Sequence, residues 1–464
     1  MRWPRVDWPW KDGAGRVGAK DRWAGLKTQA QRAFLEHLAP RLVRSGLLYD
    51  VGERLARLRA ADYPPRATGV MAQAGLSLVR RAYSRRYRRR VVWTNVFAPT
   101  EILYAMDLLP FSLEAAAATA ASLGLAGYLL DVAERNWYSS DSCSFHRCAL
   151  GAALAGFLPA PAALLCTSHI CDGAPKAFAR CAEAAGRPLF VLDTPVVTGG
   201  GAAAAAESYL ARQIETAANE ISRLTGSALR PERLREACRL SNEARRWMLE
   251  CAALRRDRPA PVTGAQSLGF LFAVFTMQGS QAAVDVYRTL ARELAARRRD
   301  GRAAVPRETA RLLWLHLYPF YPNGVLTFLE QGHGAVVVAE EFTHVYWDDL
   351  DPHDPFASLA RKCLSHFGYG EASRRARAVA ALAQEYDVDG VIHFSHWGCR
   401  QSCGGVRLIK DELGRRGVPL LALDGDCVDR RSYAEGQTLT RLAAFLEMLG
   451  VPAGHGGGPI TARG

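Results

Sequence analysis

The chain has 464 residues, of which 49% are hydrophobic and 23% are charged. This composition is ordinary for a soluble globular protein and excludes a disordered chain, a collagen and a coiled coil, and the length corresponds to two or three domains with their own cores. The formal net charge of +13 belongs to residues 1–90, which hold 21 Lys and Arg against 7 Asp and Glu.

Residues 1–90 are predicted to form a basic, helical N-terminal extension. Apolar residues recur at helical spacing in AFLEHLAPRLVRSGLLYDVGERLARL, and the pattern breaks at Pro64 and Pro65. We interpret the arginine-rich run that ends at Arg90 as a solvated helix face, in preference to a docking site for an anionic ligand or an acidic partner. Nucleic acid is the weakest interpretation, because no recognisable nucleic-acid module accompanies the charge.

The opening residues and two apolar stretches bear on the location of the protein. The start, MRWPRVDWPWKDG, breaks any apolar run, so we expect no secretory signal and a cytoplasmic protein. Residues 115–130 and 148–166 approach the length of a membrane span, but both are rich in Ala and Gly. We therefore expect no association with a membrane and interpret both stretches as buried elements.

Residues 91–204 are predicted to form a first α/β domain. Its predicted strands are RVVWTNVF, ALLCTSHI and PLFVLDTP, and its predicted helices cover residues 100–108 and begin near Asp172. Short β-branched runs that alternate with helical stretches indicate a parallel sheet.

The same alternation returns after a helical segment that is predicted over residues 205–305. Residues 306–452 are predicted to form a second α/β domain, with the strands LLWLHLY, AVVVAEEF, GVIHF and VPLLALD and a long helix at 371–386. Two such domains predict a cleft between them, in which ligands bind outside the carboxyl ends of the strands. Residues 453–464 are expected to be a disordered tail.

Six of the eleven cysteines form three close pairs, which are Cys143 and Cys148, Cys166 and Cys171, and Cys399 and Cys403. Cys171 and Cys399 each follow a predicted strand, in two different domains. A thiolate at such a strand end meets the positive end of a helix, which should lower its pKa and favour an anionic metal–sulfur cluster.

The spacing of the pairs leaves the metal open. Structural zinc typically uses two C-x2-4-C knuckles, whereas four residues intervene in two of these pairs. Thiolates from separate loops that meet in one cleft suit an iron–sulfur cluster. From spacing alone we favour an iron–sulfur site over unrelated structural cysteines, and zinc is the third alternative.

Six stretches between Phe97 and Leu449 occur in an order that is specific as a set. They are FAPTEILYAMDLLP, CSFHRCALGAALAGFLPAP, TSHICDGAPKAF, GRPLFVLDTP, DGVIHFSHWGCRQSCGG and GVPLLALDGDCVDRRSYAEGQTLTRLAAFLEML. Together they resemble the family of 2-hydroxyacyl-CoA dehydratases and benzoyl-CoA reductases, which includes the double-cubane cluster proteins. Residues 1–90 lie outside the resemblance.

The resemblance implies two flavodoxin-like, Rossmann-like α/β domains that face a cleft and bind a 4Fe-4S cluster. The ligand positions of the family fall on Cys143, Cys171 and Cys399, which leaves one iron open to a substrate oxygen. A double-cubane 8Fe-9S cluster would need more ligands. The secondary candidates for it are Cys148, Cys166 and Cys403.

The resemblance also implies an enzyme, a lyase that acts on an acyl-CoA substrate under anaerobic conditions. Family members receive one electron from a separate ATP-dependent iron–sulfur activator protein, and this chain has no G-x4-GK[ST] loop for ATP. The electron converts the thioester carbonyl of a 2-hydroxyacyl-CoA into a ketyl radical anion, which expels the 2-hydroxyl group. Loss of a β-proton and return of the electron then give the enoyl-CoA. We expect a homologous or identical second subunit.

Three polar residues beside these motifs are candidates for catalysis. Glu101, in the PTEILYA motif, could accept a proton or anchor a hydroxyl group, and helix capping is the alternative. His146 and His169 flank ligand positions and could donate to the cluster or to the thioester, although a structural role is favoured for both.

Two other functions stay open from the sequence. The first is a benzoyl-CoA reductase-like or double-cubane oxidoreductase of the same family, which would consume electrons in stoichiometric amounts. The second is a non-catalytic cluster-binding protein that has the fold without the chemistry.

Overall fold

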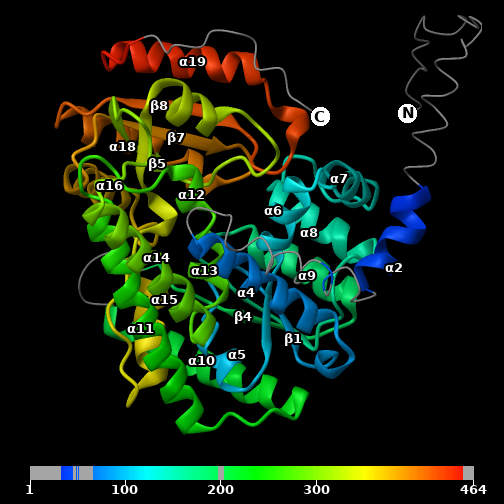
Figure 1. The fold of residues 1–464 in the computed structure, drawn as a ribbon. Coiled ribbons are helices and arrows are strands. Elements are labelled where there is room, and N and C mark those ends of the chain that lie inside the picture. Colours follow the sequence, from blue (N-terminus) through cyan, green and yellow to red (C-terminus); the bar gives the residue numbers. More distant parts are fainter. Residues whose placement is uncertain (1–32, 45–48, 50, 52–65, 197–202, 453–464) are drawn as a thin grey trace, which may run out of the picture.

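The structure, a computed structural model, describes residues 33–44, 49, 51, 66–196 and 203–452 (Figure 1). The predicted disordered tail and much of the predicted N-terminal extension lie outside the described residues. The described parts of the extension are largely helical, and they include a π-helical turn at Phe34–Leu38, α2 at Ala39–Arg44 and α4 at Arg66–Tyr83. The helix α4 packs against the helical segment between the two sheets.

The first sheet has four parallel strands in the order β2-β1-β3-β4. They are β1 (Val91–Thr94), β2 (Leu109–Ser112), β3 (Ala163–Thr167) and β4 (Leu189–Leu192). One face packs against α6 (Leu113–Ser122), α7 (Ala126–Arg135), α8 (Ser144–Leu154) and α9 (Ala174–Ala185). The other face packs against α5 (Glu101–Ala105) and α10 (Ala203–Thr225). Burial on both faces explains why these strands are runs of apolar residues.

The strand β2 is not among the strands predicted from the sequence. It contains Pro110, which has no backbone N–H to donate to a neighbouring strand. The strand lies at the edge of the sheet, where a proline is tolerated. The helix predicted at 100–108 ends at Ala105. The chain then turns at Asp107, which has a φ of 53°, and enters β2.

The second sheet repeats the strand order of the first, β6-β5-β7-β8, with all strands parallel. They are β5 (Ala310–Leu315), β6 (Ala335–Glu340), β7 (Gly390–His396) and β8 (Leu420–Gly425). The helices α16 (Ala372–Glu385) and α18 (Val406–Gly414) cover one face, and α19 (Glu435–Met448) covers the other. Two parallel sheets with helices on both faces confirm the predicted pair of flavodoxin-like α/β domains.

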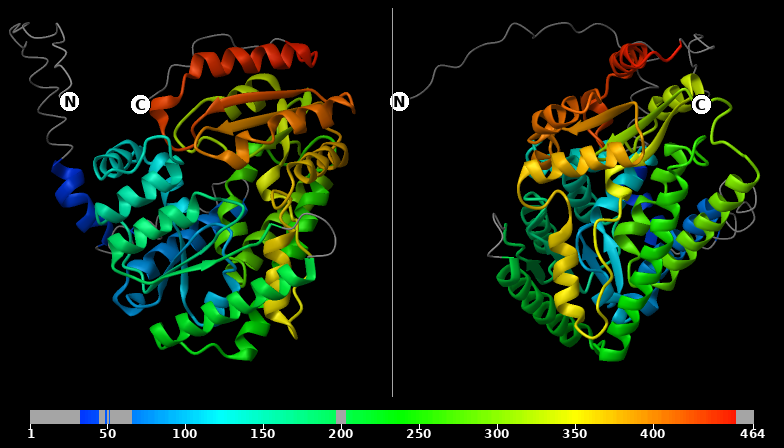
Figure 2. Two further views of the ribbon diagram at one scale, coloured as in Figure 1. Left: turned by 180° about the vertical axis from the view of Figure 1, so that it is seen from behind. Right: turned by 90° about the vertical axis from the view of Figure 1, so that its left-hand side faces the viewer.

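Helices fill the chain between the two sheets, as the sequence predicts. They are α11 (Pro231–Leu254), α12 (Gly264–Leu268), α13 (Leu271–Thr276) and α14 (Gln281–Arg299). A further helix, α15 (Pro355–Ser365), belongs to the second α/β segment in sequence but packs against α10 of the first. Figures 1 and 2 show the second sheet and α19 stacked above the first sheet, with α11, α14 and α15 alongside. The domain boundaries themselves stay a prediction.

Across the ranges described, no helix is both long enough and apolar enough to cross a bilayer. The two apolar stretches in question are divided between buried helices and β3, which agrees with their interpretation as core elements.

Candidate functional site

A cavity lies between the two sheets, next to the carboxyl ends of their strands, and it encloses about 850 Å³ of empty space including its mouth. Its wall is built from segments that follow six strands: Phe97 after β1, Glu114 after β2, Cys171 after β3, His316 after β5, Phe342 after β6 and Cys399 after β7. This is the position where open α/β sheets bind ligands. The predicted cleft is confirmed.

Three cysteines from separate elements line this cavity. Cys143 immediately precedes α8, Cys171 lies between β3 and α9, and Cys399 lies between β7 and the short helix α17 (Arg400–Cys403). The loops meet closely, because a Cβ at Gly398 would lie 2.5 Å from the Cα of Cys143. A side chain at position 398 would therefore push the two loops apart.

The predicted lowering of the thiol pKa by a helix end is wrong for Cys399, and the pKa of Cys143 is raised as well. Burial, together with the neighbouring sulfurs of Cys171 and Cys399, raises the pKa of Cys143 well above its ordinary value. Burial and Cys171 raise the pKa of Cys399 to about 12. Desolvation thus outweighs the helix ends, and a bound cation would be needed to keep these thiols ionised at neutral pH.

The sulfur of Cys143 receives a hydrogen bond from a histidine whose tautomer is fixed. The Cys427 backbone N–H donates to Nδ1 of His396 over 3.3 Å, so the proton of the neutral ring sits on Nε2. That Nε2 lies 3.3 Å from Cys143 Sγ, and burial lowers the pKa of His396, which keeps the ring neutral. The Ser402 backbone N–H donates to Cys399 Sγ over 3.4 Å. Donors to thiolate sulfur are typical of iron–sulfur sites, where they tune the potential.

Of the three predicted catalytic residues, His146 lines the cavity. Its Nε2 lies 3.9 Å from Cys171 Sγ and 3.8 Å from an oxygen of Glu114. Burial alone would lower the pKa of His146, but these two neighbours raise it to about 10. The imidazole can therefore hold a proton at Nε2 beside the cavity.

The other two candidates, Glu101 and His169, are not part of the cavity wall, and their catalytic roles stay predictions. Glu101 is fully buried, and its Oε1 accepts from Ser241 Oγ at 2.8 Å and from Lys362 Nζ at 2.6 Å. The ring of His169 packs edge-on against Tyr369. Glu101 is directed toward α11 and α15 because its partners are there, which gives it the geometry of a structural ion pair.

The three secondary cysteines are not brought into the cavity. Cys148 and Cys166 are fully buried in the apolar core on the α6–α9 face of the first sheet. Cys403 is exposed, and its Sγ donates to the His396 carbonyl oxygen at 3.3 Å. The wall of the cavity therefore offers one set of three thiols rather than two.

The cavity wall also holds polar residues that the sequence analysis missed. Glu114 follows the unpredicted strand β2, and it accepts from Ser112 Oγ at 3.2 Å. Arg375 of α16 forms a two-point ion pair with Glu341, with Nε–Oε1 at 2.6 Å and Nη2–Oε2 at 2.8 Å. Recognition of β2 would have identified Glu114, because residues after a parallel strand end face ligands.

A single metal ion does not fit this arrangement. Within the part of the chain that the structure describes, no three His, Cys, Asp or Glu side chains are grouped to hold one ion. Tetrahedral zinc requires each ligand atom within about 2.3 Å of one centre. A cubane differs, since each thiolate binds a different iron and the sulfurs lie farther apart. The cluster and the zinc alternative both stay predictions.

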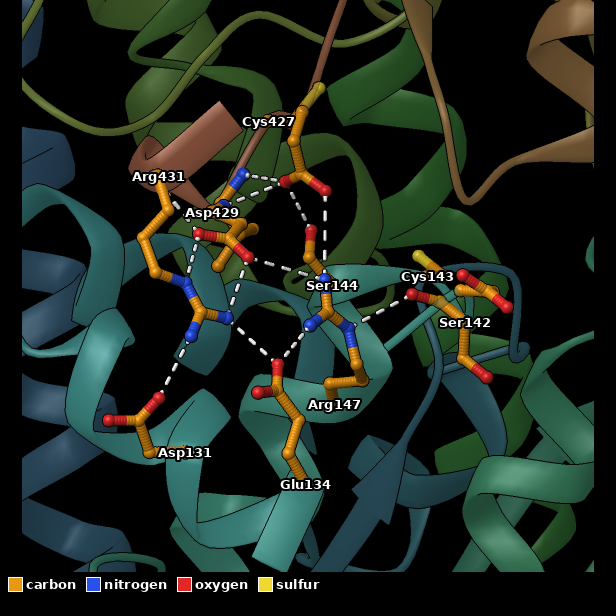
Figure 3. Close-up of polar contacts among 12 residues, drawn as sticks. Asp131, Glu134, Ser142, Cys143, Ser144, Arg147, Cys427, Asp429 and Arg431 are labelled. Carbon is orange, nitrogen blue, oxygen red and sulfur yellow. Dashed lines mark hydrogen bonds and ion pairs between the residues drawn. The ribbon is translucent and has the colours of Figure 1, made fainter. Parts of the chain in front are cut away.

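A network of charged side chains joins the two domains next to Cys143 (Figure 3). Arg147 of α8 donates to Glu134 at 2.5 Å and to Asp429 at 3.4 Å, and Asp429 follows β8 in the other domain. Ser144 Oγ donates to Asp426 Oδ1 at 2.5 Å across the same boundary. Arg431, whose side chain is half exposed, pairs with Asp429 and Glu134. This network fixes the loop of Cys143 against the second domain.

We expect Arg147→Met to destabilise the protein by about 3 kcal/mol, because it removes the buried guanidinium that pairs with Glu134 and Asp429 and leaves both carboxylates with the half-exposed Arg431 alone. Arg431→Met is the matched control and should cost less than about 1 kcal/mol, since that side chain is 47% exposed. The urea concentration at the midpoint of unfolding measures both. Equal shifts for the two variants would contradict this account of the network.

Comparisons with known proteins agree with the motifs. Residues 95–449 match the protein family described as 2-hydroxyglutaryl-CoA dehydratase, D-component. The (R)-phenyllactyl-CoA dehydratase alpha subunit of Clostridium sporogenes is 24% identical over 78% of this chain and 89% of the relative. The (R)-2-hydroxyisocaproyl-CoA dehydratase alpha subunit of Clostridioides difficile is 22% identical over 78% and 90%. A subunit of the benzoyl-CoA reductase of Thauera aromatica is 26% identical over 70% and 80%.

Proposed function

The chain belongs to the family of the 2-hydroxyglutaryl-CoA dehydratase D-component, and from this premise we propose that it is the iron–sulfur component of a 2-hydroxyacyl-CoA dehydratase. Cys143, Cys171 and Cys399 hold a 4Fe-4S cluster in the cavity, and the substrate is an acyl-CoA thioester. The observation that carries the proposal is the convergence of three free thiols, from segments far apart in sequence, on one buried cavity between two domains.

The residues around the thiols fit such a cluster. Burial and mutual repulsion hold Cys143 and Cys399 protonated unless a cation binds them, and N–H donors of His396 and Ser402 are directed at the same two sulfurs. When bound, the cluster supplies a low-potential electron and an iron site that is open to a substrate oxygen. The aromatic wall of the cavity excludes water from the thioester.

Two residues of this chain can move the protons of the elimination. Loss of water from a 2-hydroxyacyl-CoA requires a base for the β-proton, and Glu114 is a carboxylate on the cavity wall with no arginine or lysine paired to it among the described residues. His146 holds a proton at Nε2 beside Glu114 and Cys171, where it can protonate the leaving hydroxyl group. Arg375 and Glu341, which also line the cavity, neutralise each other.

The proposal includes two partners. An ATP-dependent iron–sulfur activator would supply the electron, as the resemblance implies. A second subunit, homologous or identical, would complete the enzyme, in keeping with the names of the relatives as alpha subunits of dehydratases.

Electron stoichiometry tests the proposed reaction. The protein is purified without oxygen, with any co-purifying subunit, and given a limiting low-potential reductant and a 2-hydroxyacyl-CoA. We expect many molecules of enoyl-CoA per electron, because the electron returns after each elimination. One reduced product per two electrons would favour the reductase alternative, and a chain that binds no iron would contradict the proposal.

A further inference from the structure

Much of the cavity wall is aromatic. It includes Phe97, Phe145, Phe272, Phe275, Phe320 and Phe342. Their rings contact one another edge to face or tilted, with centroid distances of 5.9 Å for Phe97–Phe275 and 6.0 Å for Phe275–Phe342. Such a surface binds an apolar group through dispersion and release of water.

The wall offers no unmatched positive charge. Arg375 is its one arginine or lysine among the described residues, and Glu341 neutralises it by a two-point ion pair. The ring of His146 places its Nε2 3.8 Å from an oxygen of Glu114, so the carboxylate beside it would be its counter-ion. Burial lowers the pKa of His366 to about 3 and that of His316 well below its ordinary value, so both rings are neutral. A carboxylate on the substrate's acyl chain would lose its hydration and lie near Glu114 without a counter-ion.

Two polar atoms of the wall lack a hydrogen-bond partner among the described residues, Nδ1 of His316 and Nε2 of His366, and the proton position can be assigned for His366. The Gly368 backbone N–H donates to Nδ1 of His366 over 3.0 Å, so the neutral ring carries its proton on Nε2. His366 is 3% exposed, and its Nε2 has no hydrogen-bond partner among the described residues. An unsatisfied buried donor is costly unless a ligand oxygen accepts from it.

We infer that the acyl group taken by this cavity is uncharged and apolar, aromatic or branched aliphatic in type, and that His366 Nε2–H donates to an oxygen at its thioester end. This inference rests on the proposed function and narrows it. The preferred ligands are then CoA thioesters of monocarboxylic acids. An acyl group that carries a second carboxylate is excluded as the preferred ligand.

Equilibrium binding to the anaerobically purified holoprotein tests the inference without turnover. The probes are thioesters that lack the 2-hydroxyl group: 3-phenylpropanoyl-CoA, 4-methylpentanoyl-CoA and glutaryl-CoA. Since all three share the CoA moiety, differences in affinity report on the acyl group. We expect the first two to bind at least about tenfold more tightly than glutaryl-CoA. Equal or tighter binding of glutaryl-CoA would overturn the inference and leave the proposed function standing, whereas no binding of any thioester would overturn both.

Two variants separate the two parts of the inference. Phe275→Ala should weaken binding of 3-phenylpropanoyl-CoA by about tenfold or more and change glutaryl-CoA little, while Phe34→Ala, at an exposed position, should change neither. His366→Phe should weaken all three thioesters by a similar factor of about ten. An unchanged affinity for free coenzyme A shows that each variant is folded. Unaltered thioester affinities in Phe275→Ala and His366→Phe would contradict the inference.

Discussion

Cys171→Ser is expected to remove most of the iron from the chain and to abolish turnover. A serine hydroxyl ionises far less readily than a thiol and is a poorer ligand for iron, so two thiolates would remain where three are needed. The measurement is iron and acid-labile sulfide per chain after purification without oxygen. Cys143→Ser and Cys399→Ser should give the same result, because the three sulfurs line one cavity.

Cys238→Ser is the matched control for this prediction. Cys238 is fully buried, but it lies in α11. There it packs on the face of the first sheet that α5 and α10 cover. Its substitution should leave the iron content unchanged. If Cys171→Ser retained full iron, or if Cys238→Ser lost as much, the assignment of the ligands would be wrong.

Glu114→Gln is expected to lower kcat by about 10²- to 10⁴-fold with little change in KM or iron content. The amide preserves the shape of the side chain and its place beside Ser112, but it cannot accept the β-proton. Steady-state kinetics with a 2-hydroxyacyl-CoA measure the effect. Glu183→Gln, on the exposed surface of α9, is the control and should behave as the wild type.

The size of the loss in kcat tests the role of Glu114 as the base. A kcat within twofold of the wild type would instead show that another group accepts the proton.

Most of the fold follows from local sequence patterns. The apolar, β-branched runs at β1, β3 and β4, and at β5 to β8, predict seven strands, since strands buried on both faces need such residues. The strand β2 was missed because it is four residues long and contains Pro110, features that are tolerated at a sheet edge and argue against a strand elsewhere.

The site was predicted in part. Cys171 and Cys399 could be placed from strand ends alone, because parallel strands direct their carboxyl ends to one edge. Cys143 precedes a helix rather than following a strand, so only the resemblance indicated it. His366 carries no local signal, since only the packing of α15 beside the cavity brings it there.

The role expected for Glu101 shows why sequence patterns are insufficient for polar residues. Its helix position was predicted correctly, but the direction of its side chain is set by Ser241 and Lys362, which are 140 and 261 positions away in the chain. The pKa of the Cys399 thiol was misjudged for a related reason. Proximity to a helix end is visible in sequence, whereas the depth of burial of Cys143 and Cys399 depends on both domains together.

The content of iron and acid-labile sulfide in the anaerobically purified wild-type protein tests the central claim most directly. The account predicts about four irons and about four sulfides per chain, held by three cysteines. Zinc in place of iron would contradict the account. A protein that contains no metal, and whose three thiols all react with an alkylating agent, would contradict it as well.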